Sequence, residues 1–370
     1  MELTDFFSGL TYSPDNIVEN NGTLVLRSSN IKAGEVTDAD NVYVDSAVVN
    51  CDNVQIGDVI VVVRNGSRSL IGKHGQVKVE MPNTVIGAFM TGLRSPQATY
   101  VNTLLDTKQF DLEITKNLGA TINQITTGAF KQMTFSVSKN DEEQTAIGTF
   151  FRTLDNIIAI YKRKLDELRE LKKAYLQQMF PQAGEVVPRV RFKGFTAPWV
   201  ERKIGDVFTV TRGQVLAATK VSTVKNISNI YPVYSSQTKN NGLLGYFDEY
   251  LFDTAITWTT DGANAGTVNY RDGKFFSTNV SGVLISNDGY VNPCVAEAIN
   301  MIAWKYVSKV GNPKLMNNTM SEITILLPIV DEQIIIGKFL LDLDSQIAMQ
   351  VQKIELFNNL KTTYLQKMFI

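Results

Sequence analysis

Two stretches of the chain repeat apolar residues at alternating steps of four and three. In residues 142–180, and again in residues 331–369, this 3.5-residue period predicts a long helix with a seam against a partner helix. A lysine interrupts the stripe at the same place in both, at Lys172 and Lys361. The seam positions that we expect are Ile147, Phe151, Leu154, Ile158, Leu165 and Leu168 in the first helix, and Ile336, Leu340, Leu343, Ile347, Ile354 and Phe357 in the second.

These two stretches are copies of one another. They align without a gap at an offset of 189 residues, and 17 of 39 positions are identical. The identical pairs include Glu143/Glu332, Gln144/Gln333, Gly148/Gly337, Asp155/Asp344, Lys172/Lys361 and Tyr175/Tyr364. One copy alone would be an ordinary amphipathic helix, but two matched copies indicate a duplicated unit. Either direction of packing is sterically open, and we expect an antiparallel coiled coil in which Leu154 meets Leu343 and Ile158 meets Ile347 across one shared seam.

The regions between the helices have a different pattern. They contain short apolar runs, such as 59–63 and 323–327, separated by Asn-Gly and Asp-Gly turn signals. We therefore expect an α+β protein in which two β-rich domains are separated by the two long helices. The predicted boundaries are a first domain at 1–140, a helix at 141–180, a proline-containing linker at 181–204, a second domain at 205–330 and a helix at 331–370.

Composition excludes several classes of protein. The formal net charge is −1, and the first variable region carries −3 while residues 189–330 carry +4, so any nucleic-acid site must be a local patch. Two distant cysteines make neither a disulfide framework nor a cysteine zinc site, and they fit a reducing cytoplasm. There is no apolar run near 18 residues and no secretory signal, so we expect no membrane association.

We find no convincing catalytic motif. The segment 66–74 resembles a phosphate-binding loop, but five residues separate its glycines and His74 stands where Ser or Thr must hold Mg²⁺. Asn292-Pro293-Cys294-Val295 lacks the second proline and the aromatic residue of an adenine methyltransferase motif. His74 is expected at the surface or in a turn rather than as a general base. We therefore expect no enzyme activity, no cofactor and no metal site.

Several passages, together with the duplication, resemble the DNA specificity subunit of type I restriction–modification systems. They are 26–31, 231–236, 258–268, 327–333 and the two Tyr-Leu-Gln-x-Met-Phe helix ends. The resemblance implies a non-catalytic reader of double-stranded DNA, built as recognition domain, helix, recognition domain, helix. It implies that two methyltransferase (modification) subunits dock on the helices, and that ATP-dependent restriction subunits can join them.

The resemblance places DNA contacts on loops of both domains, where polar side chains read base edges in the major groove. In the first domain we expect Arg27, Ser28, Ser29, Asn30, Arg64, Asn65 and Arg68. In the second we expect Ser235, Ser236, Gln237, Lys239, Asn240, Thr260, Asp261 and Asn264. For any one of these residues a solvated loop position is as good an interpretation as a base contact.

The chain departs from the family pattern before the first domain. A lead-in at 189–204 precedes the second domain, whereas Met1 corresponds to Gly205 and puts the opening strand of the first domain in doubt. Two other functions stay open. A coiled-coil scaffold with ligand-binding or protein-binding β domains would lack sequence-selective DNA affinity, and a self-contained modification enzyme would need the cofactor motif that we do not find.

Overall fold

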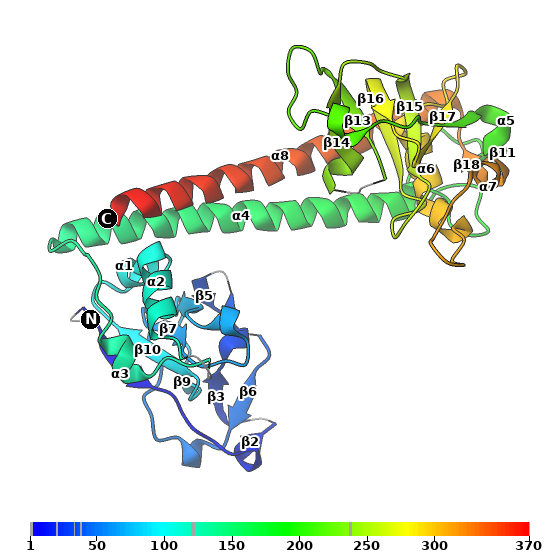
Figure 1. The fold of residues 1–370 in the computed structure, drawn as a ribbon. Coiled ribbons are helices and arrows are strands. Elements are labelled where there is room, and N and C mark those ends of the chain that lie inside the picture. Colours follow the sequence, from blue (N-terminus) through cyan, green and yellow to red (C-terminus); the bar gives the residue numbers. More distant parts are fainter. Residues whose placement is uncertain are drawn as a thin grey trace. The chain divides into compact units, whose positions relative to one another are not determined.

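The computed structural model describes residues 3–19, 21–32, 34–37, 39–119, 123–236 and 239–369. The chain forms two compact units, one of residues 1–163 with 352–370 and one of residues 164–351. Each unit holds one β-rich domain together with parts of two long helices, α4 (Asp141–Met179) and α8 (Val330–Met368) (Figure 1). This arrangement confirms the predicted α+β class.

The two long helices occupy equivalent places in the repeat. Each has 39 residues; α4 begins at the predicted boundary, residue 141, and α8 begins one residue before the predicted boundary, residue 331. The side chain of Asn140 caps the N-terminus of α4, because its Oδ1 accepts hydrogen bonds from the backbone N–H groups of Glu142, at 2.8 Å, and Glu143. Acidic residues in the first turn of both helices suit the positive end of the helix dipole.

Aromatic pairs within each unit show that α4 and α8 run antiparallel. In the first unit Phe150 meets Tyr364, with ring centroids 5.2 Å apart, and Tyr161 stacks on Phe357 at 5.5 Å. In the second unit Tyr175 meets Phe339 at 4.8 Å. As the residue number rises along α4 it falls along α8, which confirms the predicted direction.

The antiparallel direction overturns one expected set of contacts. Leu154 and Ile158 lie in the first unit, whereas their repeat equivalents Leu343 and Ile347 lie in the second. Equivalent positions therefore do not meet across one seam, because that pairing requires parallel helices. Each stripe packs instead against the opposite end of the partner helix.

Within the described residues, the first domain has two sheets and three α-helices. Its six-stranded sheet has the order β1-β10-β7-β8-β5-β4, and its four-stranded sheet has the order β2-β6-β3-β9. The helices pack on the larger sheet through a core that contains Val61, Phe110 and Phe130. The bounds are β1 Asp5–Ser8, β2 Ile17–Val18, β3 Thr23–Leu26, β4 Ile31–Lys32, β5 Gly34–Val36, β6 Val42–Val44, β7 Val59–Val62, β8 His74–Gln76, β9 Thr84–Ile86, β10 Met90–Arg94, α1 Ala98–Leu104, α2 Lys108–Asn117 and α3 Thr127–Lys131.

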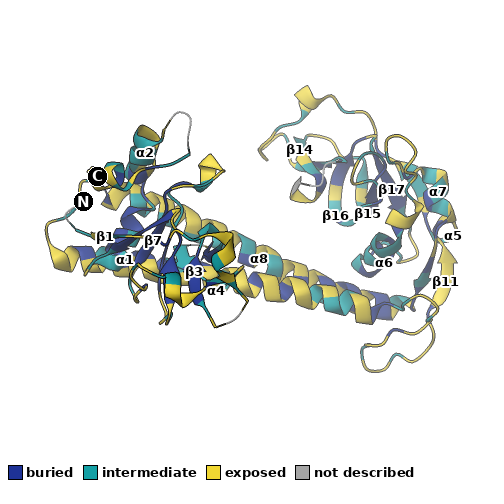
Figure 2. Cartoon of the chain, turned by 90° about the horizontal axis from the view of Figure 1, so that it is seen from below, coloured by how far each residue is buried: buried dark blue, intermediate teal, exposed yellow. Residues whose placement is uncertain are grey.

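The second domain has a six-stranded sheet of the order β12-β17-β15-β16-β13-β14 and a separate pair, β11-β18. Its core surrounds Trp258 and includes Ile299 of α6. Figure 2 shows the buried interiors of both domains in dark blue. The bounds are β11 Val200–Lys203, α5 Ile204–Val207, β12 Thr209–Arg212, β13 Tyr231–Tyr234, β14 Leu243–Phe247, β15 Phe252–Thr259, β16 Val268–Ser277, β17 Ser281–Ile285, α6 Pro293–Ala303, α7 Asn317–Glu322 and β18 Thr324–Leu327.

The two domains share a strand framework. β1 pairs antiparallel with β10 as β12 does with β17, and β3 pairs parallel with β9 as β13 does with β16. Isolated parallel bridges at Leu10–Gly87 and Gln214–Thr278 occupy equivalent places. The opening strand of the first domain, which the sequence left in doubt, is therefore present as β1.

The domains differ where the lead-in lies. In the second unit β11 pairs with β18, and Arg191 forms two contacts with Glu332, at 2.6 and 2.7 Å. In the first unit residues 135–138, which are equivalent to β18, pair with no strand among the residues described. The glutamate at the repeat position of Glu332 is Glu143, which is exposed. Within the described residues the two units therefore correspond in their long helices and differ at this edge.

Candidate functional site

A hollow lies at the same framework position in each domain, beside the end of the parallel strand pair. In the first domain it has a volume of about 730 Å³ and lies where β3 ends and β10 begins. In the second domain it has a volume of about 60 Å³ and lies next to the end of β13 and the start of β17. The shared position indicates that the duplicated fold offers one kind of site twice.

Five of the seven residues predicted for the first domain line the first hollow. They are Arg27, Ser28, Ser29, Arg64 and Asn65. These residues lie about 35 positions apart in the sequence, yet the Nδ2 of Asn65 donates a hydrogen bond of 3.2 Å to the Oγ of Ser28. The fold therefore brings the two predicted segments together.

The first hollow presents cations beside apolar surface. Arg27 donates from its Nη2 to the carboxylate of Asp40 at 2.7 Å, and its side chain is 38% exposed. Arg64 is exposed and lies over the ring of Phe89, with 4.8 Å from its Cζ to the ring centroid. Phe89 is itself 53% exposed. Guanidinium, amide and hydroxyl donors next to an exposed ring can contact base edges, sugars and phosphates.

Two predicted residues of this domain do not line the hollow. Asn30 is fully buried, where its Oδ1 accepts from the backbone N–H of Arg27 at 2.8 Å and its Nδ2 donates to the carbonyl of Ala39. Its amide holds the loop backbone, so in this structure Asn30 is not exposed for the base contact that we predicted. Arg68 is exposed and lies outside the hollow, in the short helical turn 68–70.

The loop after β13 holds the predictions for the second domain. Ser235 lines the second hollow, and Thr278 donates to its Oγ at 2.9 Å. Ser236 is half-buried and follows directly. Asn240 is exposed with a positive φ of 51°, which asparagine tolerates better than most residues. Gln237 lies outside the described residues, as does the side chain of Lys239.

The segment after β15 was the third predicted contact region. Thr260, which we predicted to contact a base, is buried, and its Oγ1 donates to the carbonyl of Val280 at 2.9 Å, so that in this structure it stabilises a turn. Asp261 forms an ion pair with Lys314 at 3.6 Å. Asn264 is exposed in the glycine-flanked turn that follows. None of the three lines the second hollow.

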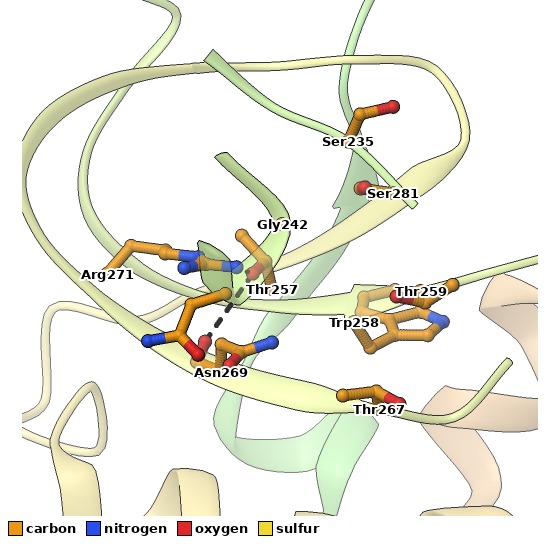
Figure 3. Close-up of a pocket in the computed structure, with 10 residues that line it drawn as sticks. Ser235, Gly242, Thr257, Trp258, Thr259, Thr267, Asn269, Arg271 and Ser281 are labelled. Atoms are coloured by element: carbon orange, nitrogen blue, oxygen red, sulfur yellow. Dashed lines mark hydrogen bonds between the residues drawn. The ribbon is translucent and has the colours of Figure 1, made fainter. Parts of the chain in front are cut away.

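Sequence reasoning missed the charged residue of the second hollow. Arg271 of β16 is only 7% exposed, and its Nε donates to the Oγ1 of Thr257 at 3.1 Å. Its guanidinium also lies over the ring of Tyr234, 3.7 Å from the centroid. Figure 3 shows it beside Thr257 and Asn269. Burial lowers the pKa of Arg271 to about 10, partly opposed by Tyr234, so that it remains a cation at neutral pH.

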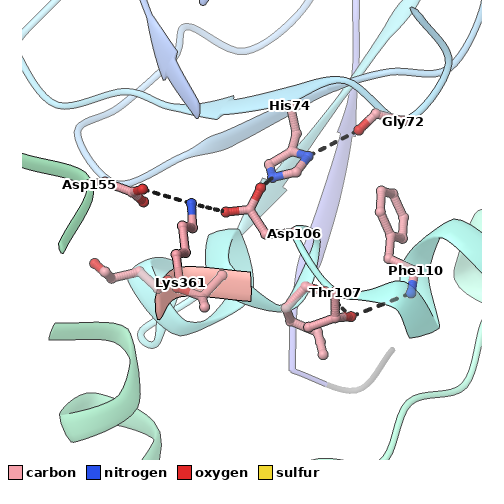
Figure 4. Close-up of polar contacts among 10 residues, drawn as sticks. Gly72, His74, Asp106, Thr107, Phe110, Asp155 and Lys361 are labelled. Atoms are coloured by element: carbon pink, nitrogen blue, oxygen red, sulfur yellow. Dashed lines mark hydrogen bonds and ion pairs between the residues drawn. The ribbon is translucent and has the colours of Figure 1, made fainter. Parts of the chain in front are cut away.

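The lysines that interrupt the apolar stripes join three elements in each unit. In the first unit Lys361 of α8 contacts Asp155 of α4 at 2.7 Å and Asp106 of the domain at 2.8 Å (Figure 4). Burial alone would lower the pKa of Lys361, but the two carboxylates outweigh it and raise the value. The lysine therefore remains charged and ties the domain to both helices.

The second unit repeats this arrangement. Lys172 of α4 contacts Asp344 of α8 at 2.6 Å and Glu297 of α6 at 3.4 Å. Lys172 and Asp344 are the repeat equivalents of Lys361 and Asp155, so the same ion pair is made twice with the helices exchanged. The acids that the domains supply come from outside the repeat and could not be found by aligning it.

His74 extends the network in the first unit. Its side chain is 9% exposed, so the expectation of a surface or turn position was wrong. Its Nδ1 lies 3.0 Å from the carbonyl of Gly72, and its Nε2 lies 3.4 Å from Asp106. Burial would raise the pKa of Asp106, but His74 and Lys361 outweigh it and lower the value to about 2.

Most of the predicted seam positions are buried in the structure, and Figure 2 shows the exposed faces of both helices in yellow. The buried positions are Phe151, Leu154, Ile158, Leu165, Leu168, Ile336, Leu340 and Leu343. The half-buried positions are Ile147, Ile347, Ile354 and Phe357.

The repeated glycines allow the domains to approach the long helices closely. A Cβ on Gly148 would lie 2.7 Å from the backbone nitrogen of Tyr100, and one on Gly337 would lie 3.2 Å from Pro293.

The motif at 292–295 has a structural role. Asn292 caps α6, because its Oδ1 accepts from the backbone N–H of Val295 at 3.0 Å. Its Nδ2 donates to Gln333 of α8 at 2.9 Å.

In the part of the chain that the structure describes, no cluster of three or more His, Cys, Asp or Glu could hold a metal ion. Nor does any helix of that part have the length and apolarity needed to cross a bilayer.

Comparison with known proteins identifies the family. Residues 1–170 and 197–358 each match the type I restriction modification DNA specificity domain. The chain belongs to this family. The two matches cover both units, which agrees with the duplication that the sequence and the strand framework display.

Relatives in the specificity-subunit family cover parts of the chain. A type I specificity subunit (N-terminus) of Mycoplasma pneumoniae is 42% identical over 124 residues, which are 33% of this chain and 65% of the relative. The specificity subunit of the type I restriction enzyme MpnII of the same organism is 34% identical over 143 residues, 38% of this chain and 42% of the relative. The chain thus spans less than two thirds of the length of these relatives.

A solved structure supports the fold over the full length. The crystal structure of a type I restriction–modification S subunit from M. genitalium matches with a TM-score of 0.73 and covers 100% of this chain and 94% of that one. The sequence identity is 16%, so this likeness concerns the fold.

Proposed function

We propose that this chain is the DNA-reading subunit of a type I restriction–modification complex. Each domain reads one half of a bipartite target, and partner subunits carry out methylation of adenine and restriction. The observation that carries the proposal is the pair of hollows at one framework position, each lined by cationic and hydrogen-bonding side chains. Membership of the specificity family supports it.

We assign the chain no catalytic step of its own. Two modification subunits dock on the exposed faces of α4 and α8, and ATP-dependent restriction subunits can join the assembly in the cytoplasm. The duplication supports two docked copies, because each helix offers its partner an equivalent outer face. Purified chain with S-adenosylmethionine, Mg²⁺ and ATP is expected to leave DNA unmodified and uncut, and to acquire activity only when the partners are added.

The first hollow provides a sharp test of reading by the first domain. The chain is produced together with its modification subunits, and the methylated bipartite target is determined by methylation-sensitive sequencing. In Arg64→Gln we expect relaxed or changed preference in one half of that target, because one guanidinium contact contributes about 1–3 kcal/mol to discrimination.

Arg68→Gln is the matched control. It removes the same charge from an exposed arginine four residues away, which the sequence also predicted to contact DNA but which does not line the hollow, so the pair tests whether the hollow itself reads the target. We expect its methylated target to equal that of the wild type. If Arg64→Gln also leaves both halves of the target unchanged, or if the wild-type complex methylates without sequence preference, the proposed reading by this hollow is wrong.

A further inference from the structure

The second hollow contains a buried cation without an acidic partner. Among the residues that the structure describes, no carboxylate lies within ion-pair distance of Arg271. Its Nε donates to Thr257, its guanidinium lies over the ring of Tyr234, and the side chain lines the hollow. A buried charge without a counter-charge is costly, so an anion that enters this place is favoured.

The rest of the lining suits an oxyanion. Ser235, Asn241, Thr259, Asn269 and Ser281 contribute hydroxyl and amide groups, and the lining contains no carboxylate. Asn269 and Arg271 are two residues apart on β16, which places their side chains on the same face of the strand. The volume of about 60 Å³ exceeds the roughly 10–15 Å³ that one ordered water requires. The lining therefore supplies donors that suit an oxyanion.

We infer that Arg271 and the hydroxyl and amide groups around it form a binding site for a phosphate group, and that its occupant is a phosphodiester of bound DNA. The inference rests on the proposed function and deepens it, since it gives the second domain a backbone contact that fixes its position on the duplex. Base reading is left to the neighbouring loop that contains Ser236 and Asn240. Phosphate contacts commonly set the register in this way, while other side chains read the sequence.

The test measures how DNA affinity depends on salt. A fluorescein-labelled 40-base-pair duplex of mixed sequence is titrated with the full chain at several KCl concentrations. The plot of log affinity against log salt has a slope of about −0.9 for each phosphate contact. Arg271→Gln is expected to reduce the slope by about one and the affinity by about tenfold at low salt.

Two further variants separate binding from folding. Arg202→Gln removes an equal charge from an exposed position on β11 and is expected to keep the wild-type slope. Asn269→Asp places a carboxylate beside Arg271, so it is expected to preserve or raise the melting temperature while it lowers DNA affinity as Arg271→Gln does. A purely structural Arg271 would not make Asn269→Asp weaken DNA binding.

Inorganic phosphate is the second probe. The melting temperature of the wild type is compared in sodium phosphate and in sodium chloride of equal ionic strength, and a phosphate-specific rise that disappears in Arg271→Gln supports the site. If the wild type binds the duplex and both hollow variants keep its salt slope, the inference is overturned while the proposed function stands. If the wild type binds phosphate through Arg271 but binds no duplex, the DNA assignment and the proposed function both fail.

Discussion

The buried ion pair between Arg191 and Glu332 is expected to contribute strongly to the stability of the second unit. The carboxylate of Glu332 is completely buried, and the side chain of Arg191 is 12% exposed. Removing the arginine by Arg191→Met leaves a buried charge without its partner, which costs about 3–5 kcal/mol in comparable pairs. The bidentate geometry, at 2.6 and 2.7 Å, places this pair among the strong ones. We therefore expect a loss of about 3 kcal/mol or more in the unfolding free energy of the second unit.

The chain offers a matched control and a selective signal. Arg189→Met removes an arginine two positions away, whose pair with Glu185 is exposed and should contribute little to stability. All three tryptophans, at 199, 258 and 304, lie in the second unit, so tryptophan fluorescence during urea unfolding reports that unit alone.

Two outcomes decide the matter. Arg191→Met combined with Glu332→Gln is expected to recover most of the lost stability, because the unpaired charge is then gone. If Arg191→Met shifts the urea midpoint no more than Arg189→Met, the buried pair does not hold the lead-in to α8, and our reasoning about this edge is refuted.

Three further changes probe the first unit and the seam. Above pH 4, Asp106→Asn should lower the unfolding free energy by about 2 kcal/mol, because the pKa of Asp106 is lowered to about 2 in the folded chain. As the pH falls from 4 to 2 the wild type loses this stabilisation, so the difference in melting temperature between the two proteins, followed by circular dichroism, should become smaller. Gly148→Val should lower the melting temperature of the first unit, because the new side chain would overlap the backbone of Tyr100. Gly128→Val, where no atom lies closer than 4.0 Å to the added Cβ, should lower the melting temperature less. Ile158→Asp buries a charge in the seam and should cost several kcal/mol by urea unfolding, and an unchanged midpoint would contradict the packing of α4 on α8.

The helices could be predicted almost to the residue, for a physical reason. A 3.5-residue apolar period is a local property of the chain, and its duplication marked which positions serve a common role. The direction of packing also agreed with expectation. The contacts of Leu154 and Leu343 did not, because sequence identity matches equivalent positions, while an antiparallel pair brings non-equivalent positions together.

The candidate site was harder to predict because polar residues in loops look alike in sequence. Asn30 and Thr260 have the composition of base-reading residues, yet both are buried and stabilise turns. Arg271 was missed for the opposite reason, since it lies with Asn269 on the face of β16 opposite to Val268 and Tyr270, where alternation predicts a solvated polar side chain rather than a buried one. Whether a side chain stabilises a turn or faces a ligand depends on tertiary neighbours that one-dimensional patterns do not contain.

The duplicated lysine links what varies in this fold to what repeats. Lys361 and Lys172 each hold one carboxylate from the partner helix and one from a domain, Asp106 in the first unit and Glu297 in the second. The helix carboxylates are repeat equivalents, but the domain carboxylates lie at different positions, just after α1 and within α6, the helices that follow the equivalent strands β10 and β17. A domain can therefore change its loops and its target and still attach to the helices, provided that one of its carboxylates contacts the repeated lysine. On this reasoning an exchanged recognition domain docks on the helices when it brings such an acid, whatever its DNA-facing residues are.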